Sequence, residues 1–204
     1  MSSWQRMSLP NAITLSRVPL MFVIVGLMYY AWPGAATLAF VLFLAAAVGD
    51  WYDGFLARRR GLVSNFGKLM DAMADKIMVM GIVIALVDKH RIPVVLALIT
   101  LCREFFVTGM RMVAASKGVV VAADSGGKSK TVTQLIALGF FLGAPMLSQD
   151  GDYLFHWDMS GFVSLVYRLG YVIFIVSTAL SVWSGYRYIS RNARLVFGDE
   201  ASQR

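Results

Sequence analysis

The sequence is poor in cysteine and in charge. Cys102 is the only cysteine among 204 residues, so disulfides contribute nothing, and its apolar surroundings predict a packing role. Only 15% of the residues are charged, whereas soluble globular proteins average about 25%. Residues 1–17 also lack an apolar segment followed by a small-residue cleavage site, so we expect no cleaved signal peptide. These absences exclude a disulfide-stabilised secreted domain and most soluble classes.

Apolar residues make up 58% of the chain, and its mean hydropathy is +0.65. Turn-forming stretches at 32–34, 88–93, 118–127 and 148–160 separate six apolar segments, each near the length of a bilayer-spanning helix. Trp4, Met7 and Leu9 suggest a short interfacial segment before the first of them. The sequence therefore predicts one all-α integral membrane domain over residues 1–204, with six transmembrane helices at 13–31, 35–56, 67–87, 92–116, 129–147 and 161–189.

Charge is lopsided, with 19 Lys and Arg against 12 Asp and Glu and a formal net charge of +7. One side of the predicted membrane would hold only Lys89, Arg91 and Arg168, together with both histidines. Most other cations fall on the opposite side, which the positive-inside rule makes cytoplasmic. Both termini are therefore predicted inside, and the excess charge indicates contact with anionic lipid and phosphorylated substrates rather than nucleic acid. The cytoplasmic cations are Arg6, Arg58, Arg59, Arg60, Lys68, Arg111, Lys117, Lys128, Lys130, Arg187, Arg191, Arg194 and Arg204.

Four carboxylates lie inside the predicted membrane boundary. Asp50 and Asp53 are near the end of the second segment, and Asp71 and Asp75 are near the start of the third. A charge at mid-membrane costs about 2.5–3.5 kcal/mol, so these acids demand compensation. Each pair falls on one helix face, and the short connection predicts antiparallel neighbouring helices whose acidic faces meet at the cytoplasmic surface.

Facing carboxylates stay ionised only beside cations, and hard oxygen ligands suit Mg²⁺ or Mn²⁺. Four charges balance two divalent ions, which form a template for phosphoryl transfer. Gly54, Ala57 and Gly67 would give a ligand room to approach the backbone, although close helix packing explains the same small residues. Arg58 is suited to bind a diphosphate.

From Asp50 to Asp75 the residues spell Asp-x2-Asp-Gly-x2-Ala-Arg-x8-Gly-x3-Asp-x3-Asp, which resembles the signature of the CDP-alcohol phosphotransferase family. The resemblance implies a six-helix membrane enzyme with a polar cavity facing the cytoplasm, usually a homodimer. Flanking stretches resemble the bacterial phosphatidylglycerophosphate synthase subfamily and imply a bacterial inner membrane; one departure is Ala72, where we expect proline. These stretches are PNAITLSR at 10–17, GKLMDAMADK at 67–76, REFFVTGMR at 103–111 and GGKSKT at 126–131.

The resemblance also implies residue roles and a reaction. Asp50 and Asp71 would bind both metal ions, Asp53 the first, and Asp75 the second while also acting as general base. The sn-1 hydroxyl of glycerol 3-phosphate would attack the lipid-side phosphorus of CDP-diacylglycerol and release CMP. The donor contacts expected on this basis are Asn11, Thr14, Gly54, Ala57, Arg58, Ser64 and Gly67.

The acceptor phosphate requires cations, for which we expect Arg111 and Lys128, supported by Arg103 and Lys130, with Arg187 a weaker candidate. Arg103 and Arg111 lie about 80° apart around one helix, so their head groups could converge. The two lysines follow Gly126 and Gly127 at the start of the fifth helix, where free N–H groups favour phosphate. Two alternatives stay open: Arg103 simply pairs with Glu104 or a neighbouring carboxylate, and Lys130 is only a topology charge.

Polar lining by Thr108, Thr131, Thr133 and Gln134 is also open, although threonines in membrane helices often bond their own backbone. Other acceptors for the same donor are serine, inositol phosphate or phosphatidylglycerol. An ion-coupled transporter is the alternative from a different class, because intramembrane carboxylates often mark ion paths. A transporter would place its acids near the midplane, whereas all four here are close to one interface.

Overall fold

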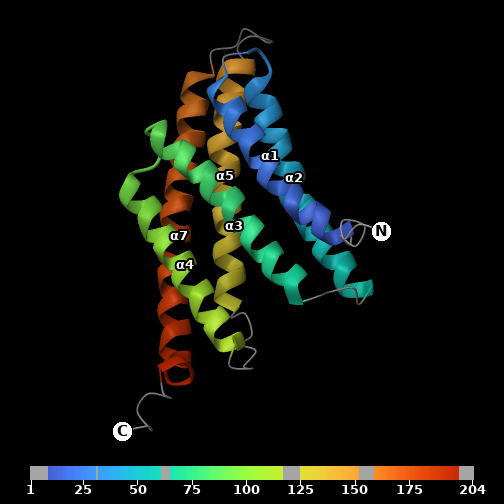
Figure 1. Cartoon of the computed structure of the whole chain (residues 1–204). Coiled ribbons are helices and arrows are strands. Elements are labelled where there is room, and N and C mark those ends of the chain that lie inside the picture. The colour runs from blue at the N-terminus through green and yellow to red at the C-terminus, as the bar shows by residue number, and fades with distance from the viewer. Residues whose placement is uncertain (1–8, 31, 61–64, 117–124, 152–158, 198–204) are drawn as a thin grey trace.

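The computed structural model describes residues 9–30, 32–60, 65–116, 125–151 and 159–197, and within these ranges it contains helices and no strand (Figure 1). Each of the six predicted apolar segments falls on one α-helix, so the all-α prediction is confirmed. Successive helices run in opposite directions, and the predicted interfacial segment at 1–8 lies outside the described residues. The α-helices are α1 (Leu9–Tyr29), α2 (Ala35–Arg60), α3 (Asn65–Asp88), α4 (Val94–Ser116), α5 (Ser125–Pro145) and α7 (Ser160–Phe197).

Two of the predicted breaks are tight turns at the same end of the bundle. Between α1 and α2, Gly34 takes a φ of +94°, a conformation that glycine adopts without the steric cost of a Cβ. After α3, His90 has a φ of 55°, and the N–H of Arg91 donates to the carbonyl of Leu86 at 2.9 Å. This is the left-handed residue that commonly ends a helix.

The ends of the fifth helix differ from the prediction. It begins at Ser125 rather than 129, so both glycines belong to its first turn, and a π-helical turn, η2 (Met146–Gly151), continues it where we expected a polar loop from 148. Asp150, which is 4% exposed, explains the extra turn. Its carboxylate accepts hydrogen bonds from the backbone N–H of Gly34 (2.8 Å) and from the N–H and hydroxyl of Thr37 (2.7 and 2.6 Å). It thereby caps the N-terminus of α2.

Replacing Asp150 by alanine should lower the stability of the protein by about 1–2 kcal/mol, because the first turn of α2 loses its cap and buried donors lose their acceptor. Thermal unfolding of the purified protein in detergent measures the change. Ser148→Ala is the matched control, since that exposed hydroxyl donates a hydrogen bond to the nearby Pro145 carbonyl at 3.4 Å and does not bond α2 within the described residues. An unchanged midpoint for the Asp150 variant would contradict the capping role.

The bundle is organised around α5 and α7, which make its most extensive helix pair. Phe141 of α5 and Phe174 of α7 are fully buried and meet edge to face, with ring centroids 6.4 Å apart. On one side, α1 packs against both α2 and α3, while α2 also contacts α5; on the other, α4 lies against α7. The core therefore excludes much of α4, whose buried contacts with α7 form a small separate cluster of Val107, Met110 and Tyr188.

The outer surface of the bundle is strongly apolar. On α4, Leu98, Phe105 and Phe106 are between 51% and 70% exposed, and Cys102 is exposed on the same face. The predicted packing role of Cys102 is therefore wrong, because its helix turns this face away from α7. Such outward apolar faces are typical of chains surrounded by lipid.

Within the described residues, two segments are long and apolar enough to cross a membrane by length and composition, Ser129–Gly151 and Ser160–Arg191. Ser16–Tyr29 and Ala35–Gly49 are shorter apolar helices. In α4 the apolar run is interrupted by Arg103, Glu104 and Arg111. This composition is compatible with a membrane protein. The charged residues of α4 contact neighbouring helices, as described below.

Candidate functional site

The segments that carry the predicted acidic site reach the same end of the bundle. Asp50 and Asp53 belong to the last part of α2, and Asp71 and Asp75 to the first part of α3 (Figure 1). The first turns of α1, which hold Asn11 and Thr14, and the start of α5, which holds Lys128, reach this end as well. Ser64 lies outside the described residues, as do the side chains of Asn11, Thr14, Asp50, Asp53, Gly54, Ala57, Arg58, Gly67, Asp71, Asp75 and Lys128.

One expectation about these helices needs correction. We expected α2 and α3 to be direct neighbours, but among the described residues α1 packs against both of them, and no backbone contact joins α2 to α3. The short connection makes the two helices antiparallel, as predicted, yet it leaves room for a third helix beside them. Contact between the two aspartate pairs at the acidic end stays a prediction.

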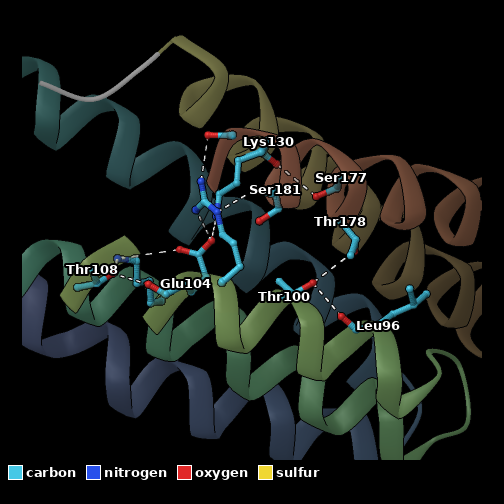
Figure 2. A network of polar contacts seen from close by, with 11 residues as sticks. Leu96, Thr100, Glu104, Thr108, Lys130, Ser177, Thr178 and Ser181 are labelled. Atoms are coloured by element: carbon cyan, nitrogen blue, oxygen red, sulfur yellow. Dashed lines mark hydrogen bonds and ion pairs between the residues drawn. The ribbon is translucent and has the colours of Figure 1, made fainter. Parts of the chain in front are cut away.

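A cluster of ionic side chains lies between α3, α4 and α5. Glu104 is its centre: Nη1 of Arg103 lies 2.9 Å from the Glu104 Oε1 atom, and Lys130 forms an ion pair with the same oxygen (Figure 2). Nζ of Lys76 lies 4.0 Å from the other carboxylate oxygen, Oε2. We call these four residues the Glu104 cluster. Three cationic side chains therefore surround one carboxylate.

The Glu104 cluster is largely withdrawn from solvent. The side chains of Glu104, Lys130 and Arg103 are 9%, 6% and 12% exposed, and only Lys76 is more open at 31%. The alternative that Lys130 is only a topology charge is therefore wrong, because such a charge would face the solvent. The alternative that Arg103 pairs with Glu104 is confirmed.

Contacts with α7 fix the orientation of Arg103. Its Nε donates to the carbonyl of Ser181 at 2.8 Å, and its Nη2 donates to the hydroxyl of Ser184 at 3.0 Å. Gly185 allows this close approach, since a Cβ there would lie 3.1 Å from Cγ of Arg103. With Glu104 as a third acceptor, the guanidinium has its direction set by two helices.

Arg111 lies further along α4 than Arg103, and it also faces α7. Its guanidinium carbon is 5.5 Å from the centre of the Tyr188 ring, a cation–π distance. Because Ser184 and Tyr188 are one helical turn apart, the two arginines of α4 contact successive positions on the same helix. Arg111 is exposed, unlike Arg103.

Threonine hydroxyls near the cluster bond the backbone, as anticipated. Thr108 donates to the carbonyl of Glu104 at 2.7 Å, and Thr133 donates to that of Ser129 at the same distance. Thr108 also accepts a hydrogen bond from Nζ of Lys76. It therefore helps to place that lysine beside the carboxylate.

Lys76 and Glu104 were missed as site residues by sequence reasoning. The signal for Glu104 was present, since an acid inside an apolar segment is a functional candidate in a membrane protein. Lys76 gave a weaker one: it directly follows Asp75, and nothing in the sequence shows that it meets Glu104. This contact places the Glu104 cluster beside the chain position of the predicted general base.

Two cavities lie at the other end of the bundle. One of about 390 Å³ is lined by residues that include Tyr29, Trp32, Lys89 and Asp150, and a second of about 190 Å³ adjoins it. Neither contains a predicted site residue. The concentration of charge in the Glu104 cluster, rather than cavity size, marks the candidate site.

The chain belongs to the CDP-alcohol phosphatidyltransferase family, whose pattern it matches over residues 7–183. The family resemblance predicted from the motif at 50–75 is thereby confirmed. A Bacillus subtilis protein named CDP-diacylglycerol–glycerol-3-phosphate 3-phosphatidyltransferase is 41% identical over 66% of this chain and 76% of its own length. Proteins of the same name from Rickettsia bellii and Salmonella typhimurium are 32% and 33% identical, over 89% and 90% of this chain and 93% of their own lengths.

Proposed function

We propose that this chain transfers the phosphatidyl group of CDP-diacylglycerol to glycerol 3-phosphate, giving phosphatidylglycerophosphate and CMP. The observation that carries the choice of acceptor is the gathering of three cationic side chains in the Glu104 cluster, one of which, Lys76, directly follows Asp75 in the chain. A phosphate monoester carries close to two negative charges at neutral pH and is a ligand that several cationic side chains can bind together. The names of the relatives agree with this reaction.

The donor half of the site is proposed for the acidic end of α2 and α3. Four carboxylates on two antiparallel helices form a donor set of hard oxygens, which fits two Mg²⁺ or Mn²⁺ ions. Asp50 and Asp71 would bind both ions, Asp53 the first and Asp75 the second. When bound, the ions neutralise the diphosphate and stabilise its leaving oxygen. The donor contacts proposed are Asn11, Thr14, Gly54, Ala57, Arg58, Ser64 and Gly67.

The acceptor half is proposed for the basic residues of α4 and α5. Arg103 and Lys130 belong to the Glu104 cluster, Arg111 lies further along α4, and Lys128 is in the first turn of α5. These residues would hold the phosphate while the sn-1 hydroxyl points toward Asp75. The hydroxyl oxygen attacks the lipid-side phosphorus, its proton passes to the Asp75 carboxylate, and the bond from phosphorus to the CMP oxygen breaks.

We also propose six membrane spans, a homodimer, and a bacterial inner membrane with both termini and the active site on the cytoplasmic side. Six antiparallel helices put the start of α1 and the end of α7 at the same end of the bundle, where the aspartate-bearing segments lie. Lys89 and Arg91 lie at the other end. That distribution supports a cytoplasmic acidic end by the positive-inside rule.

Release of CMP by the purified full-length protein tests this function. CDP-diacylglycerol is supplied with glycerol 3-phosphate, serine, inositol phosphate or phosphatidylglycerol in turn, with and without Mg²⁺ or Mn²⁺. We expect release only with glycerol 3-phosphate and a divalent ion. Release with another acceptor alone would reassign the acceptor, and no release with any would contradict transferase activity.

Arg111→Ala should raise the KM for glycerol 3-phosphate about tenfold and change kcat less, because a cation that holds the acceptor phosphate is lost. Arg91→Ala is a matched control: that guanidinium also lies over a tyrosine ring, at 4.0 Å from the centre of Tyr167, but at the opposite end of the bundle. Steady-state kinetics with each substrate varied gives the answer. A rise confined to the KM for CDP-diacylglycerol would move Arg111 to the donor site.

A further inference from the structure

We infer that Glu104 is a positioning residue for acceptor binding, whose carboxylate holds Lys130, Arg103 and Lys76 in the arrangement that receives the acceptor phosphate. The inference rests on the proposed function and adds to it an acidic residue in a site that must bind an anion. Glu104 would touch only protein cations and would act through them. Its role follows from the geometry of the Glu104 cluster.

The Glu104 carboxylate connects three helices. Glu104 is on α4, its Oε1 atom is shared by Arg103 and by Lys130 of α5, and its Oε2 faces Lys76 of α3 (Figure 2). Three cations gathered in a site this far from solvent repel one another strongly, because the surroundings screen charge poorly. The negative charge at their centre offsets that repulsion and keeps the three nitrogens converging.

The Glu104 carboxylate also helps to orient the cations around it. Arg103 is fixed by acceptors on α7, whereas Lys130 is an unbranched chain with rotatable bonds whose ammonium group is aimed by its ion pair. Lys76 is held between Glu104 and the hydroxyl of Thr108. Without the carboxylate, Lys130 loses the ion pair that aims its ammonium group, and Lys76 loses one of its partners.

Two buried polar atoms near the Glu104 cluster could bond a ligand. Nε2 of Gln134 and Oγ of Ser181 are buried and make no hydrogen bond within the described part of the chain. Gln134 follows Lys130 by one helical turn on α5, and the carbonyl of Ser181 accepts from Arg103. Unpartnered buried donors are costly, and oxygens of a phosphorylated polyol would satisfy them. The ligand class indicated is a phosphate monoester that also carries hydroxyl groups.

The test compares Glu104→Gln and Glu104→Asp with wild type in CMP release by the full-length protein. We expect Glu104→Gln to raise the KM for glycerol 3-phosphate about tenfold while the KM for CDP-diacylglycerol stays within about twofold. Glu104→Asp keeps the charge on a shorter side chain and should recover part of the loss. This rescue separates positioning by charge from a general loss of packing.

Thr178→Val is the matched control, because it removes a buried hydroxyl from the same α4–α7 interface without touching a cation. That hydroxyl lies 3.3 Å from the one of Thr100. Both KM values should stay near wild type. If Glu104→Gln does not fold, Glu104→Asp alone decides, with a selective rise in the KM for glycerol 3-phosphate still expected.

An unchanged or lowered KM for glycerol 3-phosphate in an active Glu104 variant would overturn the inference, as would equal rises in both KM values. Either result leaves the proposed function standing, since the wild-type protein would still release CMP with this acceptor. Failure of the wild-type protein to do so would overturn the proposed function itself. The two failures are therefore distinguishable in one experiment.

Discussion

Asp75→Asn is expected to reduce CMP release by about 10³-fold or more while leaving CDP-diacylglycerol binding in place. The amide keeps the shape of the side chain but cannot take the proton of the attacking hydroxyl, and general bases typically contribute about 10²–10⁴-fold. It is also a weaker ligand for a divalent ion than a carboxylate. Turnover is measured as CMP released under saturating substrates, and donor binding as protection from thermal unfolding.

Asp88→Asn is the matched control for this variant. Asp88 is on the same helix, α3, but at its other end, where it accepts a hydrogen bond from the Tyr29 hydroxyl at 2.7 Å. Its replacement should leave turnover near wild type. Wild-type-like CMP release by Asp75→Asn would contradict the role of Asp75, and a comparable loss in both variants would indicate a general structural effect.

Removal of divalent cations should suppress turnover by at least about a hundredfold, and readdition of Mg²⁺ or Mn²⁺ should restore it. Without cations, four neighbouring carboxylates repel one another and also repel the diphosphate of the donor. The experiment dialyses the purified protein against a chelator and follows CMP release as each metal is titrated back.

Asp71→Asn provides the matched variant for the metal titration. It should shift the concentration of Mg²⁺ needed for half-maximal activity upward, because one shared ligand is weakened, whereas Asp88→Asn should not shift it. Full activity in excess chelator would contradict the two-ion proposal. An Asp71→Asn titration identical to wild type would remove that residue from the ligand set.

Much of the fold was predictable because its information is local in the sequence. Apolar segments near the length of a bilayer span predict helices one by one, and the turn at Gly34 needs a residue that tolerates positive φ. The π-helical turn at Met146–Gly151 was not predictable in this way. It depends on Asp150 meeting the N-terminus of α2, which is more than a hundred residues away in the chain.

In the candidate site, too, local patterns could be predicted from the sequence, whereas contacts between helices could not. The aspartates and Arg58 could be proposed from the sequence, since a motif on two consecutive helices is a local pattern, and their roles stay a prediction. The partners of the cations were not found, because each helix presents several faces and the sequence does not say which face meets which helix. Arg103 was weighed as a partner of Glu104 only because the two are adjacent.

The sequence by itself determined the all-α class of the fold and the family, because hydropathy and the motif at 50–75 are properties of short stretches. Only the tertiary structure decided that α1 packs against both α2 and α3, and that Lys76, Arg103 and Lys130 share the carboxylate of Glu104. These cations come from three different helices. Their convergence follows from how the helices pack, which spacing along one chain does not encode.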